Sequence, residues 1–177
     1  MKYRRLGDSD LKVSVIGFGA WGIGGAPFWC NEGDANSVRA IMKSYELGIN
    51  FFDTAPVYGF GHSEEILGKT LKPFRDKVVY ATKCGLRWEK KTLGSITKNA
   101  TRQSILEEID QSLKRLETDY IDLYQVHWPD VETSQDETME ALLHIQQQGK
   151  IKVIGVSNYS VEQMREIMKY GKIVSLQ

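Results

Sequence analysis

Short apolar runs rich in β-branched residues alternate with longer segments of helical period, and the alternation repeats about every 30 residues. This alternation is typical of βαβα units, in which each helix returns the chain to the start of the next parallel strand. It predicts an α/β fold built on a parallel sheet. The expected strands are residues 13–18, 49–52, 78–82, 120–126, 151–156 and 173–176, with five helices between them.

Residues with strong helix-boundary preferences stand where several helices are expected to begin and end. The patterns Ser134-x-x-Glu137 and Ser160-x-x-Gln163 predict capping boxes, in which two side chains bond the free N–H groups of the first helical turn. Glycine readily adopts the left-handed conformation needed where a helix stops. The helices are therefore expected to end at Gly48, Gly149 and Gly171.

Two segments stand outside the alternation. Residues 2–6 and 11–15 flank the turn at residues 7–10, which predicts a small hairpin ahead of the first βα unit. Residues 86–100 are basic and contain glycine, and we expect them to form an exposed loop on the third unit.

The composition excludes several classes of protein. The chain has 177 residues, with 23 Lys and Arg against 23 Asp and Glu. The net charge is zero and both signs are interspersed, so the sequence predicts no basic surface that would bind nucleic acid or an anionic membrane. Cys30 and Cys84 form no disulfide or metal motif, and no apolar run suits a signal peptide or a membrane span. We expect one cytoplasmic domain over residues 1–177, with no nucleic-acid or membrane partner.

Polar side chains follow the expected strands at the points where they end. Asp53, Lys83 and His127 come directly after three of the apolar runs. In a parallel sheet or barrel these ends lie on one face, where α/β proteins place their active sites. Each residue alone has an ordinary structural explanation, as a turn residue, a lysine that reaches solvent or a buried structural histidine. The ordered set favours a site, and neutral hydrogen-bonding groups continue it at Ser157, Asn158 and Gln177.

Tyr58, in the turn that follows Asp53, could reach the same face and act as a general acid. A tyrosine hydroxyl has a pKa of about 10 in water, so proton transfer near neutrality requires a group that favours the phenolate. The Lys83 ammonium is the candidate, and Asp53 would keep that buried ammonium charged. His127 could orient a substrate oxygen or pass a proton to Tyr58. This group contains no nucleophile and no set of residues that would hold a metal, so the electrons of a reduction would come from a cofactor.

Three shorter motifs suggest other chemistries, and their contexts weigh against them. Residues 17–22 match the GxGxxG pattern of dinucleotide sites, but no helix is expected to open within these glycines. Residues 155–159 lack the last glycine of a nucleophile elbow. His62-x-x-Glu65 is an isolated pair and predicts no metal cluster.

Longer motifs in this sequence resemble those of the aldo-keto reductases, and they match in order across the whole chain. They are most similar to the bacterial sugar-, inositol- or stress-associated reductases, a branch related to the potassium-channel β subunits. The matching segments are residues 48–55, Tyr58-Gly59, residues 63–68, residues 81–83, residues 116–123, His127 and residues 155–158.

The resemblance implies a (β/α)8 barrel of the TIM type and an NADP-dependent oxidoreductase that reduces aldehydes and ketones to alcohols. The substrate would be a small carbonyl or sugar-like compound. Tyr58 would be the proton donor and His127 would orient the substrate. By motif, the implied catalytic residues are Asp53, Tyr58, Lys83 and His127. The residues implied to bind the nicotinamide carboxamide are Ser157, Asn158 and Gln177.

The length of the chain departs from the family pattern. A (β/α)8 barrel typically needs about 250 residues, so we expect an incomplete barrel of about six parallel strands and five helices, truncated at about strand six. Open edges on its first and last strands would permit self-association. Two alternatives to a reductase stay open. One is a non-catalytic nucleotide-sensing or regulatory module related to the potassium-channel β subunits, and the other is an inactive fragment of the enzyme.

Overall fold

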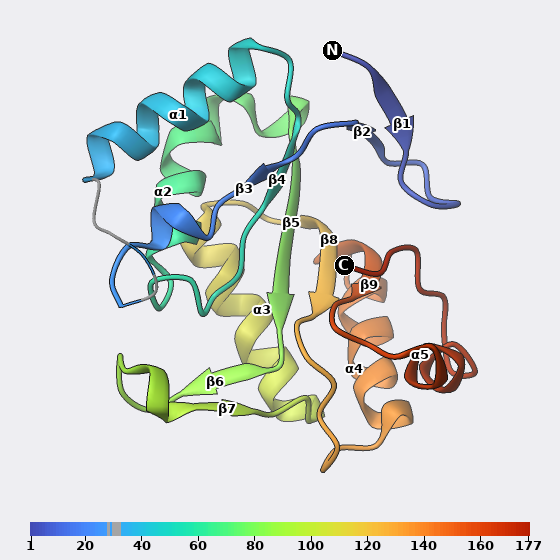
Figure 1. Cartoon of the computed structure of the whole chain (residues 1–177). Helices are drawn as coiled ribbons and strands as arrows, with labels where there is room; N and C mark the ends of the chain where they lie inside the picture. Colours follow the sequence, from blue (N-terminus) through green and yellow to red (C-terminus); the bar gives the residue numbers. More distant parts are fainter. Residues whose placement is uncertain (28, 30–32) are drawn as a thin grey trace.

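Five parallel strands form the central sheet of the computed structural model, which describes residues 1–27, 29 and 33–177. Their order along the sheet, β3–β4–β5–β8–β9, follows their order along the chain. A barrel has this order, whereas a doubly wound sheet reverses its order at a switch point. The predicted parallel α/β fold is therefore confirmed (Figure 1). The strands are β3 (Phe18–Gly19), β4 (Phe51–Asp53), β5 (Val79–Cys84), β8 (Ile121–Val126) and β9 (Ile151–Val156).

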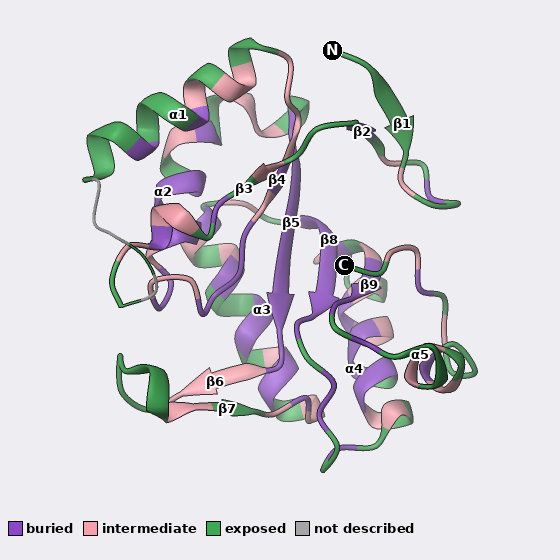
Figure 2. Cartoon of the chain, in the orientation of Figure 1, coloured by how far each residue is buried: buried purple, intermediate pink, exposed green. Residues whose placement is uncertain are grey.

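Five α-helices within the described residues connect and cover these strands, as expected. Figure 2 shows buried residues on the strands and on the helix faces that meet them, and exposed residues on the outer helix faces. Strands β5 and β8 are buried along their whole length. None of the described helices is long and apolar enough to cross a bilayer. The helices are α1 (Asp34–Glu46), α2 (His62–Leu71), α3 (Arg102–Leu116), α4 (Gln135–Gln147) and α5 (Val161–Ile167).

The first expected strand, residues 13–18, divides into two elements. Its start belongs to β2 (Lys12–Ser14), which pairs antiparallel with β1 (Tyr3–Arg5) in the predicted hairpin, and its end is β3. Strand β2 ends at Ser14, where hydrogen bonds to side chains begin. The Ser14 N–H donates to Asn50 Oδ1 at 2.7 Å, and the Ser14 hydroxyl donates to the Ile16 carbonyl at 2.7 Å. The apolar run therefore includes a partly exposed connection between two sheets.

The prediction that residues 86–100 form a loop was wrong in its secondary structure, although the segment does lie on the third unit, between β5 and α3, and is largely exposed or half-buried. These residues contain β6 (Leu86–Trp88) and β7 (Ile96–Lys98), which form an antiparallel hairpin. Each strand has three residues, too few for sequence periodicity to reveal them. The sixth expected strand, residues 173–176, is reduced to an isolated parallel bridge between Val156 and Leu176.

Only one of the two predicted capping boxes forms. At the start of α5, Ser160 Oγ accepts from the Gln163 N–H, and Gln163 Oε1 accepts from the Ser160 N–H. At the start of α4, Ser134 makes no capping bond with its side chain. Glu137 Oε1 accepts instead from the N–H of Arg102, at the start of α3, at 2.9 Å. A tertiary contact here replaces the local one that the sequence predicted.

The expected helix ends are correct in two of three cases. Gly48 and Gly149 follow α1 and α4 with φ angles of 88° and 75°, in the left-handed region that glycine tolerates. Helix α5 ends at Ile167, before Gly171.

The hairpin β1–β2 lies at the end of the sheet where the strands begin (Figure 1). It contacts the first part of the sheet through Asn50 Nδ2, which donates to the Lys12 carbonyl at 2.9 Å. It contacts the segment after α5 through an ion pair between Lys172 Nζ and Asp8 Oδ2 at 2.8 Å. At Gly7 a Cβ atom would lie 2.4 Å from the Val174 carbonyl oxygen, so the hairpin turn fits there only with glycine. The hairpin thus links the start of β4 to the C-terminal segment that follows α5.

A buried charge cluster stabilises the same end of the sheet. Asp122 of β8 accepts from Arg75 Nη2 at 2.8 Å, from Lys152 Nζ at 2.7 Å and from the Tyr80 N–H at 2.9 Å. The Arg75 guanidinium also stacks 3.9 Å from the centre of the Tyr120 ring. The Asp122 side chain is only 2% exposed, so these contacts replace the water that its charge would otherwise require.

We expect Asp122→Asn to lower the free energy of unfolding by about 3 kcal/mol, because it leaves the half-buried Arg75 without a charge partner. Urea unfolding followed by circular dichroism measures the change. Asp110→Asn is the matched control, since it removes an exposed ion pair with Lys150 and should cost less than about 1 kcal/mol. Equal effects of the two substitutions would contradict the assignment.

Candidate active site

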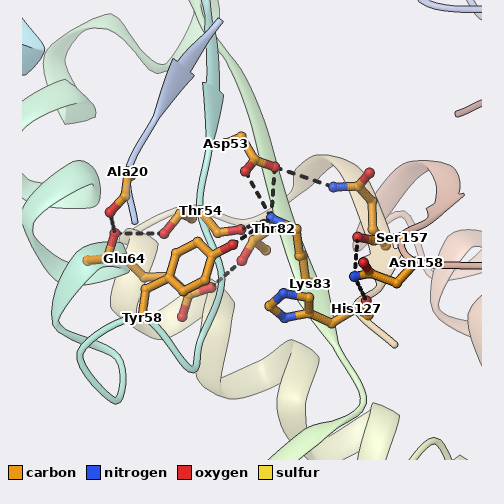
Figure 3. A network of polar contacts seen from close by, with 12 residues as sticks. Ala20, Asp53, Thr54, Tyr58, Glu64, Thr82, Lys83, His127, Ser157 and Asn158 are labelled. Atoms are coloured by element: carbon orange, nitrogen blue, oxygen red, sulfur yellow. Dashed lines mark hydrogen bonds and ion pairs between the residues drawn. The ribbon is translucent and has the colours of Figure 1, made fainter. Parts of the chain in front are cut away.

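A buried ion pair lies where β4 and β5 end. Lys83 Nζ is 2.9 Å from both carboxylate oxygens of Asp53 and donates to the Thr54 carbonyl at 2.9 Å (Figure 3). The Lys83 side chain is 1% exposed and that of Asp53 is 15% exposed. Gln125 Nε2 of β8 approaches Asp53 Oδ1 at 3.4 Å from the next strand. The parallel pairing of β4, β5 and β8 thus brings these side chains together.

Tyr58 and His127 complete the predicted set. Tyr58 lies on the loop between β4 and α2, and its hydroxyl is 3.5 Å from Lys83 Nζ. His127 follows β8, and its ring meets the Tyr58 ring edge-on, with centroids 5.8 Å apart and an interplanar angle of 83°. The structure therefore brings together Asp53, Tyr58, Lys83 and His127, which the sequence places in four separate segments (Figure 3).

The Tyr58 hydroxyl does not have the lowered pKa that we expected from Lys83. Burial raises the pKa of the phenol above its usual range, and the Asp53 carboxylate raises it further. The geometry explains the difference, because Lys83 Nζ lies closer to Asp53 than to Tyr58 and its charge is largely offset there. Burial lowers the pKa of Lys83, and Asp53 opposes this shift. Tyr58 is accordingly a protonated phenol at neutral pH.

His127 is a neutral imidazole in this site. Burial lowers its pKa to about 3, and the Lys83 ammonium contributes in the same direction. A neutral imidazole carries one N–H donor and one acceptor nitrogen. His127 can therefore donate a hydrogen bond to a substrate oxygen without adding a second charge beside Lys83.

Of the three predicted cofactor residues, Ser157 and Asn158 lie beside His127, and the backbone of Gln177 contacts Asn158. Asn158 Nδ2 donates to the His127 carbonyl and to Ser157 Oγ, both at 3.0 Å. The Asn158 N–H donates to the Gln177 carbonyl at 3.0 Å. Ser157 is buried, whereas Asn158 and Gln177 are exposed. Ser157 and Asn158 thus carry a hydroxyl and an amide next to the backbone of His127.

The sequence did not single out four polar residues that support the site. Gln125 and Thr54 contact the ion pair directly, and Ser63 and Glu64 of α2 hold the strand ends. Gln125 was detectable in principle, because it stands two positions before His127, and side chains two positions apart along a strand lie on the same side of the sheet. Ser63 and Glu64 lie inside the matched segment 63–68, yet their contacts depend on tertiary packing.

Comparison with known proteins identifies the family. Residues 15–177 match the aldo/keto reductase family. This chain belongs to the aldo-keto reductases. It is 47% identical over 166 residues to the aldo-keto reductase YhdN of Bacillus subtilis (strain 168), and 40% identical over 191 residues to the NADH-specific methylglyoxal reductase of Escherichia coli (strain K12). These alignments cover 93% and 100% of this chain.

The structural comparison agrees with this assignment. The aldo-keto reductase AKR11C1 from Bacillus halodurans, in its holo form, superposes with a TM-score of 0.90 at 38% identity and covers 99% of this chain. The chain spans about half the length of the relatives that it matches: 49% of YhdN, 58% of the methylglyoxal reductase and 56% of AKR11C1. A probable voltage-gated potassium channel subunit beta from Arabidopsis thaliana is also similar, with 36% identity over 94% of this chain.

We predict that His127 stays neutral from pH 5 to pH 8, because its pKa is lowered to about 3. Two-dimensional NMR of histidine ring signals measures this directly, and the His127 resonances should not move over that range. A His127 midpoint above pH 5 would contradict the described environment. His127→Gln identifies the resonance by its disappearance.

Proposed function

We propose that the whole protein is a nicotinamide-dependent oxidoreductase that reduces small aldehydes and ketones to alcohols. The observation that carries this proposal is the Tyr58 hydroxyl, 3.5 Å from the buried Lys83 ammonium and facing His127 where the strands end. Such a site polarises a carbonyl and supplies a proton, and it contains no nucleophile. Membership of the aldo-keto reductase family supports the same chemistry.

Tyr58 would donate the proton of the reaction. Its raised pKa keeps the hydroxyl protonated before the reaction. An alkoxide that forms from the carbonyl oxygen is a stronger base than a phenolate, so the proton moves from Tyr58 Oη to that oxygen. Lys83 would then stabilise the phenolate across 3.5 Å, while Asp53 holds the ammonium in place. The neutral His127 would orient the carbonyl oxygen by donating a hydrogen bond.

Ser157, Asn158 and Gln177 would hold a nicotinamide carboxamide beside His127. When bound, the cofactor supplies the hydride that adds to the carbonyl carbon. Asn158 Nδ2 is committed to the His127 carbonyl and to Ser157, which leaves Oδ1 to accept from the carboxamide. We propose NADP as the cofactor, with a small carbonyl or sugar-like substrate and a cytoplasmic location. Because one relative is NADH-specific, NADH is the alternative that the binding assay must include.

We also propose that residues 1–177 form the first part of a single barrel domain. The sheet of the described residues has free edges at β3 and beyond β9, and the relatives are about twice as long as this chain. In the whole protein these edges would pair with further strands, which would remove the tendency to self-associate.

A second candidate function is nucleotide sensing without turnover, favoured by the similarity to the probable potassium channel subunit beta. Assays of the whole protein separate the two. Tight NADPH binding with no turnover across a panel of aldehydes and ketones would favour sensing, whereas NADPH oxidation that depends on the carbonyl would favour the reductase.

Tyr58→Phe is expected to lower kcat for carbonyl reduction by about 100-fold or more, because the proton donor is lost. Steady-state NADPH oxidation by the whole protein measures the change. Tyr80→Phe is the matched control, since Tyr80 is a buried phenol outside the site and its hydroxyl donates to the Leu67 carbonyl at 3.4 Å. A Tyr58→Phe variant with the wild-type kcat would show that the proton comes from another group.

Gln177→Ala is expected to raise the Kd for NADPH about tenfold, because one hydrogen bond to the carboxamide is lost. Fluorescence titration gives the Kd. An unchanged Kd would remove Gln177 from the cofactor site.

A further inference from the structure

One buried hydrogen bond closes the loop that carries Tyr58. Thr54 Oγ1 and Ser63 Oγ are 2.8 Å apart, at the two ends of the loop between β4 and α2 (Figure 3). Both residues are buried, at 1% and 0% exposure. The single proton of the Ser63 hydroxyl goes to the Ala20 carbonyl at 2.8 Å, so the Thr54 hydroxyl is the donor to Ser63.

Thr54 also contacts the catalytic lysine. Its carbonyl oxygen accepts from Lys83 Nζ at 2.9 Å, while its hydroxyl is bonded to α2. Tyr58 lies between Thr54 and Ser63 along the chain, and its hydroxyl faces the same ammonium. Thr54 therefore connects the base of the Tyr58 loop to the group that Tyr58 must face.

Glu64, the neighbour of Ser63 in α2, fixes the position of Ser63. The Glu64 side chain is fully buried, and it accepts from Thr82 Oγ1 and from Arg115 Nε, each at 2.6 Å. Thr82 is the residue before Lys83 in β5. The first turn of α2 is thus tied to the strand that carries the lysine, and Ser63 cannot move independently of it.

The tip of the loop is conformationally strained and closely packed. A Cβ at Gly59 would lie 2.0 Å from the Gly24 carbonyl oxygen, so the two backbones touch there. Phe60 adopts a left-handed φ of 54°, which is unusual for an aromatic residue, and its ring packs edge-on against Trp88 at 5.5 Å. Strain of this kind persists only where surrounding contacts hold it. Opening the base of the loop would let it relax and displace Tyr58.

We propose that the Thr54–Ser63 hydrogen bond positions the Tyr58 hydroxyl against Lys83, with Thr54 and Ser63 as positioning residues that touch neither substrate nor cofactor. This inference rests on the proposed reductase function. It predicts that loss of the bond lowers the rate of proton donation, because small displacements of a reacting group slow catalysis strongly. Binding of NADPH should be unaffected, since Ser157, Asn158 and Gln177 lie on other elements.

The test compares Thr54→Val, Ser63→Ala and the double variant in the whole protein. Each single change is expected to lower kcat on the order of tenfold, with the Kd for NADPH within about twofold of the wild type. The double variant should be no slower than Ser63→Ala, because both changes remove the same bond. Thr54→Ser keeps the hydroxyl and should retain kcat within about twofold.

Thr138→Val is the matched control. Thr138 is 1% exposed, and its hydroxyl donates to the Ala100 carbonyl at 3.1 Å, away from the site. It removes a buried hydroxyl bond of the same kind and should leave kcat unchanged. If Ser63→Ala does not fold, Thr54→Val still tests the positioning role, because this variant keeps the bond from Ser63 to the Ala20 carbonyl.

Hydrogen exchange provides a second readout that needs no activity. The Tyr58 N–H bonds the Ala55 carbonyl at 3.1 Å and the Ser63 N–H bonds the Tyr58 carbonyl at 3.3 Å. In Thr54→Val these amides should exchange at least about tenfold faster than in the wild type, and in Thr138→Val at the wild-type rate.

The combined outcomes separate this inference from the proposed function. Unchanged exchange, or faster exchange with an unchanged kcat, would overturn the positioning role. If the wild-type protein reduces no carbonyl, the proposed function fails, and exchange alone then decides whether the bond holds the Tyr58 loop. Additive losses of kcat in the double variant would also overturn it, because the two hydroxyls would then act separately.

Discussion

The ion pair of Lys83 with Asp53 is the interaction on which the rest of the site depends. An ammonium with 1% exposure is unfavourable unless acceptors replace its water, and here two carboxylate oxygens and the Thr54 carbonyl do so at 2.9 Å. Parallel pairing of β4 and β5 makes this possible, because it brings the ends of neighbouring strands together. Tyr58 and His127 are then placed around a charge whose position is already fixed.

The two ends of the sheet carry different buried charges. Where the strands begin, Asp122 holds Arg75 and Lys152, and these contacts join β8 to β9 and to the segment before β5. Where the strands end, Asp53 holds Lys83 and leaves a phenol and an imidazole facing the same ammonium. This division agrees with (β/α)8 barrels, in which one end contributes stability and the other carries the active site.

Burial sets the protonation states of the site more strongly than nearby charge does. Lys83 was expected to lower the pKa of Tyr58, but burial and Asp53 raise it. Burial likewise keeps His127 neutral. The order of the motifs identifies these residues, whereas the sign of each pKa shift depends on how much water the folded chain excludes and on which partner lies nearer to the lysine.

The sequence by itself determined the parallel α/β fold, the N-terminal hairpin, the cap of α5 and the three side chains at the strand ends, Asp53, Lys83 and His127. The fold, the hairpin and the cap depend on periodicity or on residues within one turn, and each of the three side chains directly follows an apolar run, so local patterns record them. Only the tertiary structure decided the two-residue β3, the hairpin β6–β7, the contact of Glu137 with Arg102 and the bond between Thr54 and Ser63. These features join segments that meet only after folding, and their energies depend on burial that no local pattern encodes.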